Sequence, residues 1–502
     1  MNEGEKFFEL RNFEALPLCV VKSYPWPELR RELMQFRNLL RPLTIVGLPQ
    51  ADGGLKTFFV TCNDLSSTFR VFATEFSPGE KYESLTSEWR AWSNCEREFF
   101  EEFGITPLNH PWLKPLRYPF YRSNPNARVA DYPFFKLAGA AAHEVGVGPV
   151  HAGVIEPGHF RFSCKGEVVE HLECQLGYQH RGVEKLLTQG DLRSHNMLIA
   201  SIAGDTTVAN TYIYATLLES ASSLVMDVRT QMLRTIGLEL ERAALHVSTL
   251  SGISGDVGYL SGCAFMQATR TYIINSLQQI CGNRFGRGLI EPGGCRYDIT
   301  PEIRQNLIKT LSMTLERIIK FRKSFLNSPS VLSRLQTTGV VGAELVGDLN
   351  LVGVASRASG CRRDIRINYP HGMYRTFHPD KRIMHDGDVY ARTVIRLQES
   401  VDSLNFVLEL LDILDDNEHV QPKRTPTPMP PEVFTLGVCE APRGELAHVI
   451  ITKSNGNAQV YKVKDPSFNN WMGLMMALRG ENISDFPLCN KSFDLSYCGY
   501  DL

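Results

Sequence analysis

Residues 148–187 read GPVHAGVIEPGHFRFSCKGEVVEHLECQLGYQHRGVEKLL, and the rest of the chain is organised around them. Their first half is rich in Gly and Pro and holds His151, Glu156 and His159. The second half alternates as a strand does and then changes to a helical pattern near Arg181. Such a loop can place ionisable groups at a sheet edge, where a buried reaction site uses them. A hairpin with incidental His residues is the alternative, and the local pattern alone favours it.

The composition bounds the class of protein. The chain has 502 residues, 43% of them hydrophobic and 22% charged, with a formal net charge of −2. This length predicts two or three domains. The charge balance gives no argument for binding nucleic acid or an anionic membrane surface. No apolar run approaches the roughly 18 residues of a membrane span, and the N-terminus MNEGEKFFEL lacks a signal core, so we expect a cytoplasmic chain.

The twelve Cys residues are scattered, and no two of them form a Cys-x-x-Cys pair. In a cytosolic chain they are expected to be reduced thiols, many of them buried. Iron–sulfur clusters and thiolate-bound metals usually need closely spaced Cys. We therefore predict that this chain alone holds no such cluster.

Residues 1–120 are predicted to form a small α/β unit. Helical spacing covers 26–40, and three strand candidates separated by turn residues follow at 43–48, 56–62 and 69–76. A helix is expected from Ser93, which can cap it together with Glu96, and Gly104 can stop it. Residues 121–145, which contain several Pro and an Ala-rich run, are expected to be a linker.

The remainder, 146–502, is predicted to be mainly helical with small β-hairpins. Hairpins are expected at 159–164 with 168–175 and at 446–452 with 458–464. Helical patterns cover 206–250 and 259–281, and a further helix is capped by Thr300. Apolar stripes mark this helix and another one, at Ile303, Leu307, Leu311, Leu315 and Ile318, and at Val394, Leu397, Val401, Leu404, Leu408 and Leu411. Such stripes indicate a helical bundle, and the last helix is expected to start near 465–467.

The N-terminal unit resembles the 30-kDa-type subunit of respiratory complex I and the matching domain of membrane-bound hydrogenases. The residues that carry this resemblance are SLT at 84–86, Trp92, ERE at 96–98, FGI at 103–105, HP at 110–111 and LR at 116–117. The resemblance implies that the aromatic and Pro positions form a docking surface. The alternative is that they only pack the core of their own unit.

The second unit resembles the large subunit of group 4 nickel–iron hydrogenases, a family homologous to the 49-kDa subunit of complex I. Its motifs occur in the order of the family: GPVHAGVIEPGHFRF, LELER at 238–242 with His246, EPGG at 291–294, SRASG at 356–360, GDVYAR at 387–392, EAPRGEL at 440–446 and DFPLCNKSF at 485–493. Together the two resemblances imply an α+β chain, with an α/β unit followed by the hydrogenase large-subunit fold.

The metal ligands of that family are missing here. The family holds nickel and iron with four Cys, whose soft thiolates suit these metals. The aligned positions are occupied by Ala203, Thr206, Ser496 and Gly499, and Cys498 lies one position off the register. The resemblance thus implies a chain that is not an active nickel–iron hydrogenase. The end of the chain just past the motif also fits a protein without the cleaved extension of hydrogenases.

Three residues around the former metal position match functional residues of the family. Glu156 matches the glutamate that relays protons to the metal, and Arg443 matches the arginine that overhangs the metal cavity. His159 aligns approximately with the histidine that reaches the quinone headgroup in complex I. We predict these three as catalytic residues, with the alternative that the fold keeps them as buried hydrogen-bond partners. Asp205 and Asn210 are expected as new polar groups in the cavity.

The quinone site of complex I is not intact either, because the Tyr that binds quinone there falls on Leu198. The resemblance implies a large peripheral-arm subunit of a membrane-associated redox complex like NADH:quinone oxidoreductase, with no cofactor in this chain. It would couple electron transfer, with quinone as the candidate acceptor, to ion translocation.

The resemblance also implies partners and a location. The expected partners are a small iron–sulfur subunit of complex I type with 4Fe–4S clusters, and membrane-embedded antiporter-like and quinone-module-like subunits. The expected location is the cytoplasmic face of the cell's inner membrane. The alternative function is a non-catalytic scaffold or coupling subunit.

Overall fold

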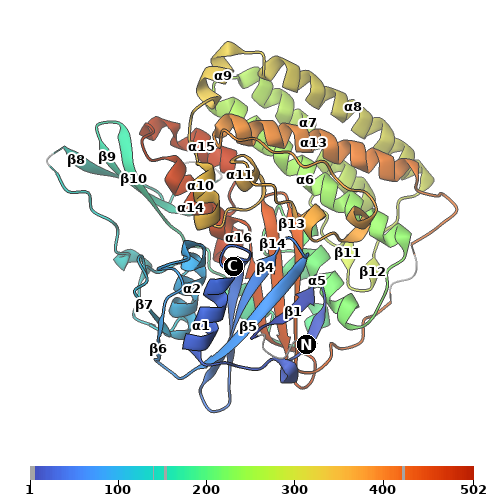
Figure 1. The fold of residues 1–502 in the computed structure, drawn as a ribbon. Helices are drawn as coiled ribbons and strands as arrows, with labels where there is room; N and C mark the ends of the chain where they lie inside the picture. The colour runs from blue at the N-terminus through green and yellow to red at the C-terminus, as the bar shows by residue number, and fades with distance from the viewer. Residues whose placement is uncertain (1–5, 140, 152–154, 421–423) are drawn as a thin grey trace.

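The computed structural model describes residues 6–139, 141–151, 155–420 and 424–502 (Figure 1). The N-terminal part is built on an antiparallel sheet with the order β1-β5-β4-β3. Its strands are β1 (Phe8–Arg11), β3 (Arg41–Pro49), β4 (Leu55–Asn63) and β5 (Thr68–Phe76). The strands predicted at 43–48, 56–62 and 69–76 are therefore confirmed, because runs of strand-forming residues bounded by turn residues determine them locally.

The two faces of this sheet bury different partners. On one face Phe59 and Phe72 join the core beneath α1 (Trp26–Gln35) and α2 (Ser93–Phe103). On the other face Phe58 and Val60 pack against the apolar side of a second sheet. Both faces are thus covered, as Figure 1 shows, and the strands are buried along most of their length.

The second sheet joins the two ends of the chain. Its order is β15-β14-β13-β2, with the strands β2 (Ala15–Pro17), β13 (Val433–Ala441), β14 (Gly444–Thr452) and β15 (Ala458–Lys464). The predicted hairpin of 446–452 with 458–464 is confirmed as β14 and β15. The pairing of β2 with β13 was not foreseen, since a separation of more than 400 residues leaves no local pattern.

A bundle of long helices packs beside the sheets. It consists of α6 (Val228–Asp256), α7 (Leu260–Cys281), α8 (Pro301–Phe325) and α13 (Val389–Asp412). Thr300 caps α8 as predicted, since its side chain accepts a hydrogen bond from the backbone N–H of Ile303. The helical pattern of 206–250 is divided into α5 (Thr207–Ala221) and α6, because Ser223 adopts a left-handed conformation and Asp227 caps the new helix.

Three expectations about helices need correction. Helix α2 begins at Ser93 without a side-chain cap, because the Glu96 carboxylate accepts hydrogen bonds from Ser84, Leu85 and Thr86 instead. Helix α1 ends at Gln35 rather than near residue 40. Helix α14 (Ser467–Ala477) starts where expected but is followed by α15 (Phe486–Phe493) and α16 (Tyr497–Asp501). Gly104 ends α2 with a φ of 72°, as predicted.

The organising stretch forms the predicted hairpin of β9 (His159–Lys165) and β10 (Val168–Gln175). A third strand, β8 (Ala142–Val147), extends it into a sheet that projects from the body in Figure 1. The helix expected near Arg181 is the single turn α3 (Val183–Leu186). Strand β8 begins inside the range expected to be a linker, and the division into 1–120, 121–145 and 146–502 stays a prediction.

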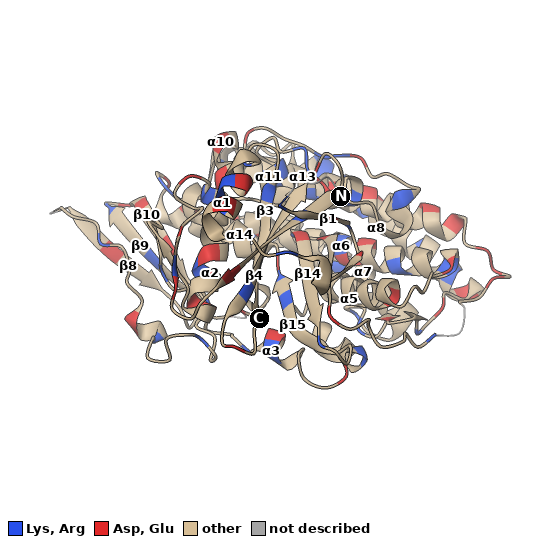
Figure 2. Ribbon diagram, turned by 60° about the horizontal axis from the view of Figure 1, so that its bottom comes forward, with Lys and Arg blue, Asp and Glu red and all other residues tan. Residues whose placement is uncertain are grey.

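Short elements complete the chain: β6 (Lys81–Glu83), β7 (Thr106–Leu108), α4 (Asn196–Ile199), β11 (Ile290–Glu291), β12 (Gly294–Cys295), α9 (Pro329–Leu335), α10 (Ala343–Asp348), α11 (Gly353–Arg357) and α12 (Ile365–Asn368). Figure 2 shows basic and acidic residues interspersed along the elements. Among the described residues, no helix combines the length and the apolar character that a membrane span requires.

Candidate functional site

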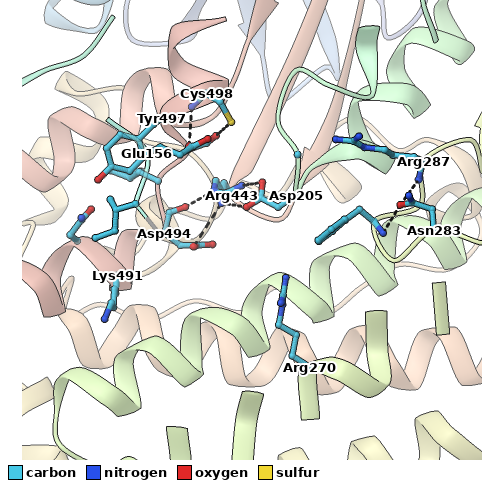
Figure 3. Close-up of a pocket in the computed structure, with 16 residues that line it drawn as sticks. Glu156, Asp205, Arg270, Asn283, Arg287, Arg443, Lys491, Asp494, Tyr497 and Cys498 are labelled. Carbon is cyan, nitrogen blue, oxygen red and sulfur yellow. Dashed lines mark hydrogen bonds and ion pairs between the residues drawn. The ribbon is translucent and has the colours of Figure 1, made fainter. Parts of the chain in front are cut away.

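A cavity of about 880 Å³ lies where α7, the loop before α5, the loop before β9 and the segment that joins α15 to α16 meet (Figure 3). Its charged lining residues are Glu156, Asp205, Arg270, Arg287, Arg443, Lys491 and Asp494. Apolar and neutral groups complete the wall, among them Ile155, Phe285, Leu495, Ser496, Tyr497 and Cys498. The cavity therefore offers both charged and apolar surface to a ligand.

Arg443 lies at the centre of a hydrogen-bonded cluster in this cavity. Its Nη1 and Nη2 atoms lie 2.9 and 2.7 Å from the two carboxylate oxygens of Asp205, which is a bidentate ion pair. The Nη1 atom also donates to Thr206 Oγ1 at 3.0 Å, and Nε donates to the backbone carbonyl of Asp494. Burial opposes ionisation of Asp205, yet the Arg443 guanidinium keeps the pKa of this carboxyl below its ordinary value.

Two further carboxylates surround the guanidinium less closely. Asp494 Oδ1 lies 3.8 Å from Arg443 Nη2, and Asp465 is buried just before α14. Each of these two residues has a buried Oδ2 atom without a hydrogen-bond partner among the described residues. Burial raises the pKa of both carboxyls in spite of the nearby Arg443 charge. One guanidinium thus faces three carboxyl groups, only one of which it binds in bidentate fashion.

Glu156 lies beside Tyr497 and Cys498 in Figure 3, in the loop before β9. Its Oε2 atom accepts a hydrogen bond from the backbone N–H of Cys498 at 3.2 Å. Burial raises the pKa of the Cys498 thiol to about 11, and the Glu156 charge acts in the same direction. Cys498 is therefore a neutral thiol at physiological pH, which is a poor nucleophile and a poor metal ligand.

The four positions that hold the metal in nickel–iron hydrogenases do not fit such a centre here. Thr206 donates no thiolate and is bound to Arg443, and Ser496 Oγ accepts from the backbone N–H of Gly499 at 2.9 Å. A Cβ atom at Gly499 would lie 2.4 Å from Asp465 Oδ2, so a Cys there needs Asp465 to move. Ala203 is buried and carries no donor. In the described part of the chain, no three His, Cys, Asp or Glu side chains are arranged to hold a metal ion.

The structure brings two of the three predicted site residues together. Glu156 and Arg443 line the same cavity, whereas His159 does not. His159 Nδ1 pairs with the Gly148 carbonyl at 2.9 Å, and its ring packs against Phe134 with the centroids 5.3 Å apart. Its Nε2 atom is buried and has no partner among the described residues. The catalytic roles of these three residues stay a prediction.

Of the two new polar groups expected in the cavity, the structure places one in its wall and the other outside it. Asp205 lines the cavity, but Asn210 is fully buried behind it, where it hydrogen-bonds to the Thr206 carbonyl and to His448. Sequence reasoning missed Asp465, Arg270 and Arg287. These residues come from separate segments, and no motif that the sequence analysis identified includes them.

Two motif residues, His246 and Arg357, belong to a buried ionic network that reaches Asp494 of the cavity wall. Arg396 Nη1 lies 3.9 Å from Asp494 Oδ2 and 3.1 Å from His246 Nδ1, and His246 Nε2 lies 2.9 Å from Glu399 Oε2. Since an Arg can only donate, His246 Nδ1 must be unprotonated and Nε2 carries the proton. Glu399 in turn binds Arg357 at 2.6 Å. The motif residues His246 and Arg357 are thus hydrogen-bond partners of Arg396 and Glu399, which accounts for their presence without a catalytic role.

Comparisons with known proteins agree with this architecture. Residues 256–436 and 424–501 match the family described as respiratory-chain NADH dehydrogenase, 49 Kd subunit. The carbon monoxide-induced hydrogenase of Rhodospirillum rubrum is 28% identical over 356 residues, which cover 70% of this chain and 98% of that protein. Formate hydrogenlyase subunit 5 of Escherichia coli is 29% identical, with 83% of this chain and 76% of that protein covered.

Two further comparisons bear on the fold. The NADH-quinone oxidoreductase of Phocaeicola vulgatus has a subunit that is 24% identical over 88% of this chain and 91% of that protein, and the match includes the N-terminal part. A chain of the archaeal membrane-bound sulfane sulfur reductase has a TM-score of 0.67 at 21% identity, and the match covers 72% of this chain and 99% of that one. The predicted fold class is confirmed, with an N-terminal unit followed by the large-subunit fold.

Proposed function

Because the chain is a complex I-related subunit, homologous to the large subunits of membrane-bound hydrogenases, we propose that it is the large peripheral-arm subunit of a membrane-associated redox complex that works without a nickel–iron centre. In this complex it couples electron transfer to ion translocation. Its partners are a small subunit with 4Fe–4S clusters and membrane-embedded antiporter-like and quinone-module-like subunits. It lies on the cytoplasmic face of the membrane.

The replacement of the metal site carries this proposal. The cavity keeps a volume of about 880 Å³ and retains Glu156 and Arg443. At the positions aligned with the thiolates, Thr206 binds Arg443 through its hydroxyl, and a side chain at Gly499 would require Asp465 to move. A retained cavity with replaced ligands supports a site that still receives a substrate but no longer holds a metal.

The residues of this chain can supply proton transfer and positioning. Glu156 is half-buried on the cavity wall, and the backbone N–H of Cys498 holds its Oε2 atom in place. A carboxylate in this position can pass a proton to an acceptor that is reduced in the cavity. The electrons come from the clusters of the small subunit, since the sequence of this chain has no Cys-x-x-Cys pair for a cluster, and quinone is the candidate acceptor.

The test is a metal analysis of the purified complex together with its turnover. We expect iron without nickel. Glu156→Gln should lower acceptor reduction by about 10²-fold, the lower range for a lost acid–base group. Stoichiometric nickel, or dihydrogen turnover, would contradict the proposal.

The second candidate function is a scaffold or coupling subunit. It is favoured because the Arg443 guanidinium is bound by residues of its own chain, which leaves it fewer donors for a substrate. Asp205, Thr206 and the Asp494 carbonyl occupy donors on Nη1, Nη2 and Nε of this guanidinium. If Glu156→Gln leaves turnover and ion transport unchanged while the complex remains assembled, the scaffold function holds and the redox function is wrong.

A further inference from the structure

Arg270 and Arg287 are two guanidinium groups without a partner in the same cavity. Arg270 lies on α7, and Arg287 lies in the loop between α7 and β11. Among the described residues, neither side chain has a hydrogen bond, an ion pair or an aromatic ring contact, and the Nε atom of each is buried. Figure 3 shows Arg270 pointing from its helix into the open space, with Arg287 on a loop above it in this view.

Two fully buried arginines elsewhere in the described part of the chain are bound to carboxylates, although the Nε atom of each also lacks a partner. Arg234 binds Glu219 at 2.6 Å, and Arg357 binds both Glu399 and Glu440 at 2.6 and 2.7 Å. A guanidinium has five donors and no acceptor, so a half-buried one without an acceptor loses hydration and gains nothing in return. A bound anion would supply the hydrogen-bond acceptors and the counter-charge that the guanidinium groups of Arg270 and Arg287 lack.

The other charged groups of the lining do not pair with Arg270 or Arg287, and Asp494 lies 3.8 Å from Arg443 and 3.9 Å from Arg396. Arg443 is neutralised by Asp205 at 2.7 Å, and Lys491 by Asp256 at 2.7 Å. Glu156 is bound to the backbone N–H of Cys498. An anion is thus attracted toward Arg270 and Arg287 and kept away from Glu156.

The rest of the lining indicates what the body of the ligand is. Phe285, Leu495, Tyr497 and Ile155 give the wall an apolar part, and Ile155 is 55% exposed, so this part of the wall is open to solvent. Apolar walls with a few placed charges select an amphipathic small molecule. The two arginines come from different segments, so each can meet a separate acidic group.

We propose that this cavity binds an organic dicarboxylate with an apolar body, whose acidic groups are held by Arg270 and Arg287. Each carboxylate accepts charge-assisted hydrogen bonds from one guanidinium, which are about twice as strong as neutral ones. The proposal concerns binding alone and does not depend on the redox function.

The test is a calorimetric titration of the purified full chain with 2,6-naphthalenedicarboxylate and with the neutral 2,6-naphthalenedimethanol. We expect the diacid to bind at least tenfold more tightly than the diol, and its affinity to fall with added salt. Arg270→Gln and Arg287→Gln should each weaken diacid binding about tenfold and leave diol binding unchanged. Arg284→Gln is the matched control, because Arg284 lies on the same loop, is exposed and does not line the cavity.

Thermal unfolding without ligand separates binding from folding. The double variant R270Q/R287Q should melt no lower than the wild type, because neither guanidinium has a partner to lose. Equal affinity of the wild type for diacid and diol, or full diacid binding by R270Q/R287Q, would overturn the proposal. Both outcomes are read at equilibrium without electron transfer, so they leave the redox function untouched.

Discussion

At the scale of the residue, the ion pair of Asp205 and Arg443 is the main charged interaction in the cavity wall. The pair is bidentate, and the Arg443 side chain is only 5% exposed. Removing one partner of such a pair leaves the other charge without compensation in a partly dry environment. The pair therefore belongs to the stability of the fold as well as to the shape of the cavity.

We predict that Arg443→Ala destabilises the chain by about 3 kcal/mol in urea unfolding. The loss lies at the low end for a broken buried pair because the Asp205 side chain is 36% exposed and water screens part of its charge. The double variant D205A/R443A should recover part of this loss, since it leaves no orphaned Asp205 carboxylate. A loss below about 1 kcal/mol in R443A would contradict this account.

The raised pKa of the buried Glu241 carboxyl should make the free energy of unfolding depend on pH. Burial raises the pKa of this carboxyl from 4.5 to about 8, with Asp205 adding to the shift, while the N–H groups of Val208 and Ala209 and the Arg242 charge oppose it. The folded state thus binds the proton more tightly than the unfolded state does. This contribution to stability is full below pH 4.5 and is lost as the pH rises through about 8.

The measurement compares the wild type with Glu241→Gln in urea unfolding at pH 6 and pH 9. The amide has one acceptor for two N–H donors, so the variant should be less stable at pH 6. Its deficit should shrink by more than about 1 kcal/mol by pH 9, because only the wild type must then ionise a buried group. A deficit that stays constant with pH would show that Glu241 does not titrate in this range.

At the scale of the element, the sequence predicts what local patterns determine. The strands β3 to β5, the hairpins and the cap of α8 by Thr300 follow from strand-forming runs, turn residues and capping, which act within a few positions. Glu96 shows the limit. Its spacing from Ser93 fits a capping box, but Ser84 and Thr86 from a preceding segment bind the carboxylate, and no local rule contains that contact.

The same limit applies to the candidate site. Glu156, Arg443 and Asp205 could be named from motif positions, and the structure brings them into one cavity. His159 could not be placed, because the path of the loop before β9 decides where its ring points. Arg270 and Arg287 could not be found, because only the packing of α7 and its following loop against the cavity reveals their missing partners.

Helix α8 offers a test of its apolar stripe. Leu311 is fully buried against the bundle, so Leu311→Ala should cost about 2–5 kcal/mol in denaturant unfolding through lost burial and a cavity. Ile319 on the same helix is 49% exposed, and Ile319→Ala should cost less than about 1 kcal/mol. Equal losses in the two variants would mean that α8 packs through a different face.

At the scale of the whole molecule, the two sheets share one core. Phe58 of β4 packs against Phe434 of β13 with the ring centroids 5.3 Å apart, and Arg41 of β3 binds Glu445 of β14. These contacts join residues from the two units that sequence resemblance separates. They could not be predicted, because each resemblance describes one unit and says nothing about the surface between them.

We therefore expect residues 146–502, produced without 1–120, to lose cooperative unfolding. The face of β13 that carries Phe434, Leu436 and Val438 would be open to water, and exposed apolar surface of this kind leads to association. Scanning calorimetry of the full chain should give one transition and the truncated chain none of comparable sharpness. A truncated chain with the same sharp transition would show that the two units fold separately.

The pairing of β2 with β13 also determines when the second sheet can form during translation. Residues 15–17 are translated more than 400 residues before their partner strand, which begins at Val433. The nascent chain must keep this short segment available while the intervening residues are made. If the gene were split between the two halves, β2 and β13 would lie on separate polypeptides. Their pairing would then be bimolecular, and its rate would depend on the cellular concentrations of both polypeptides.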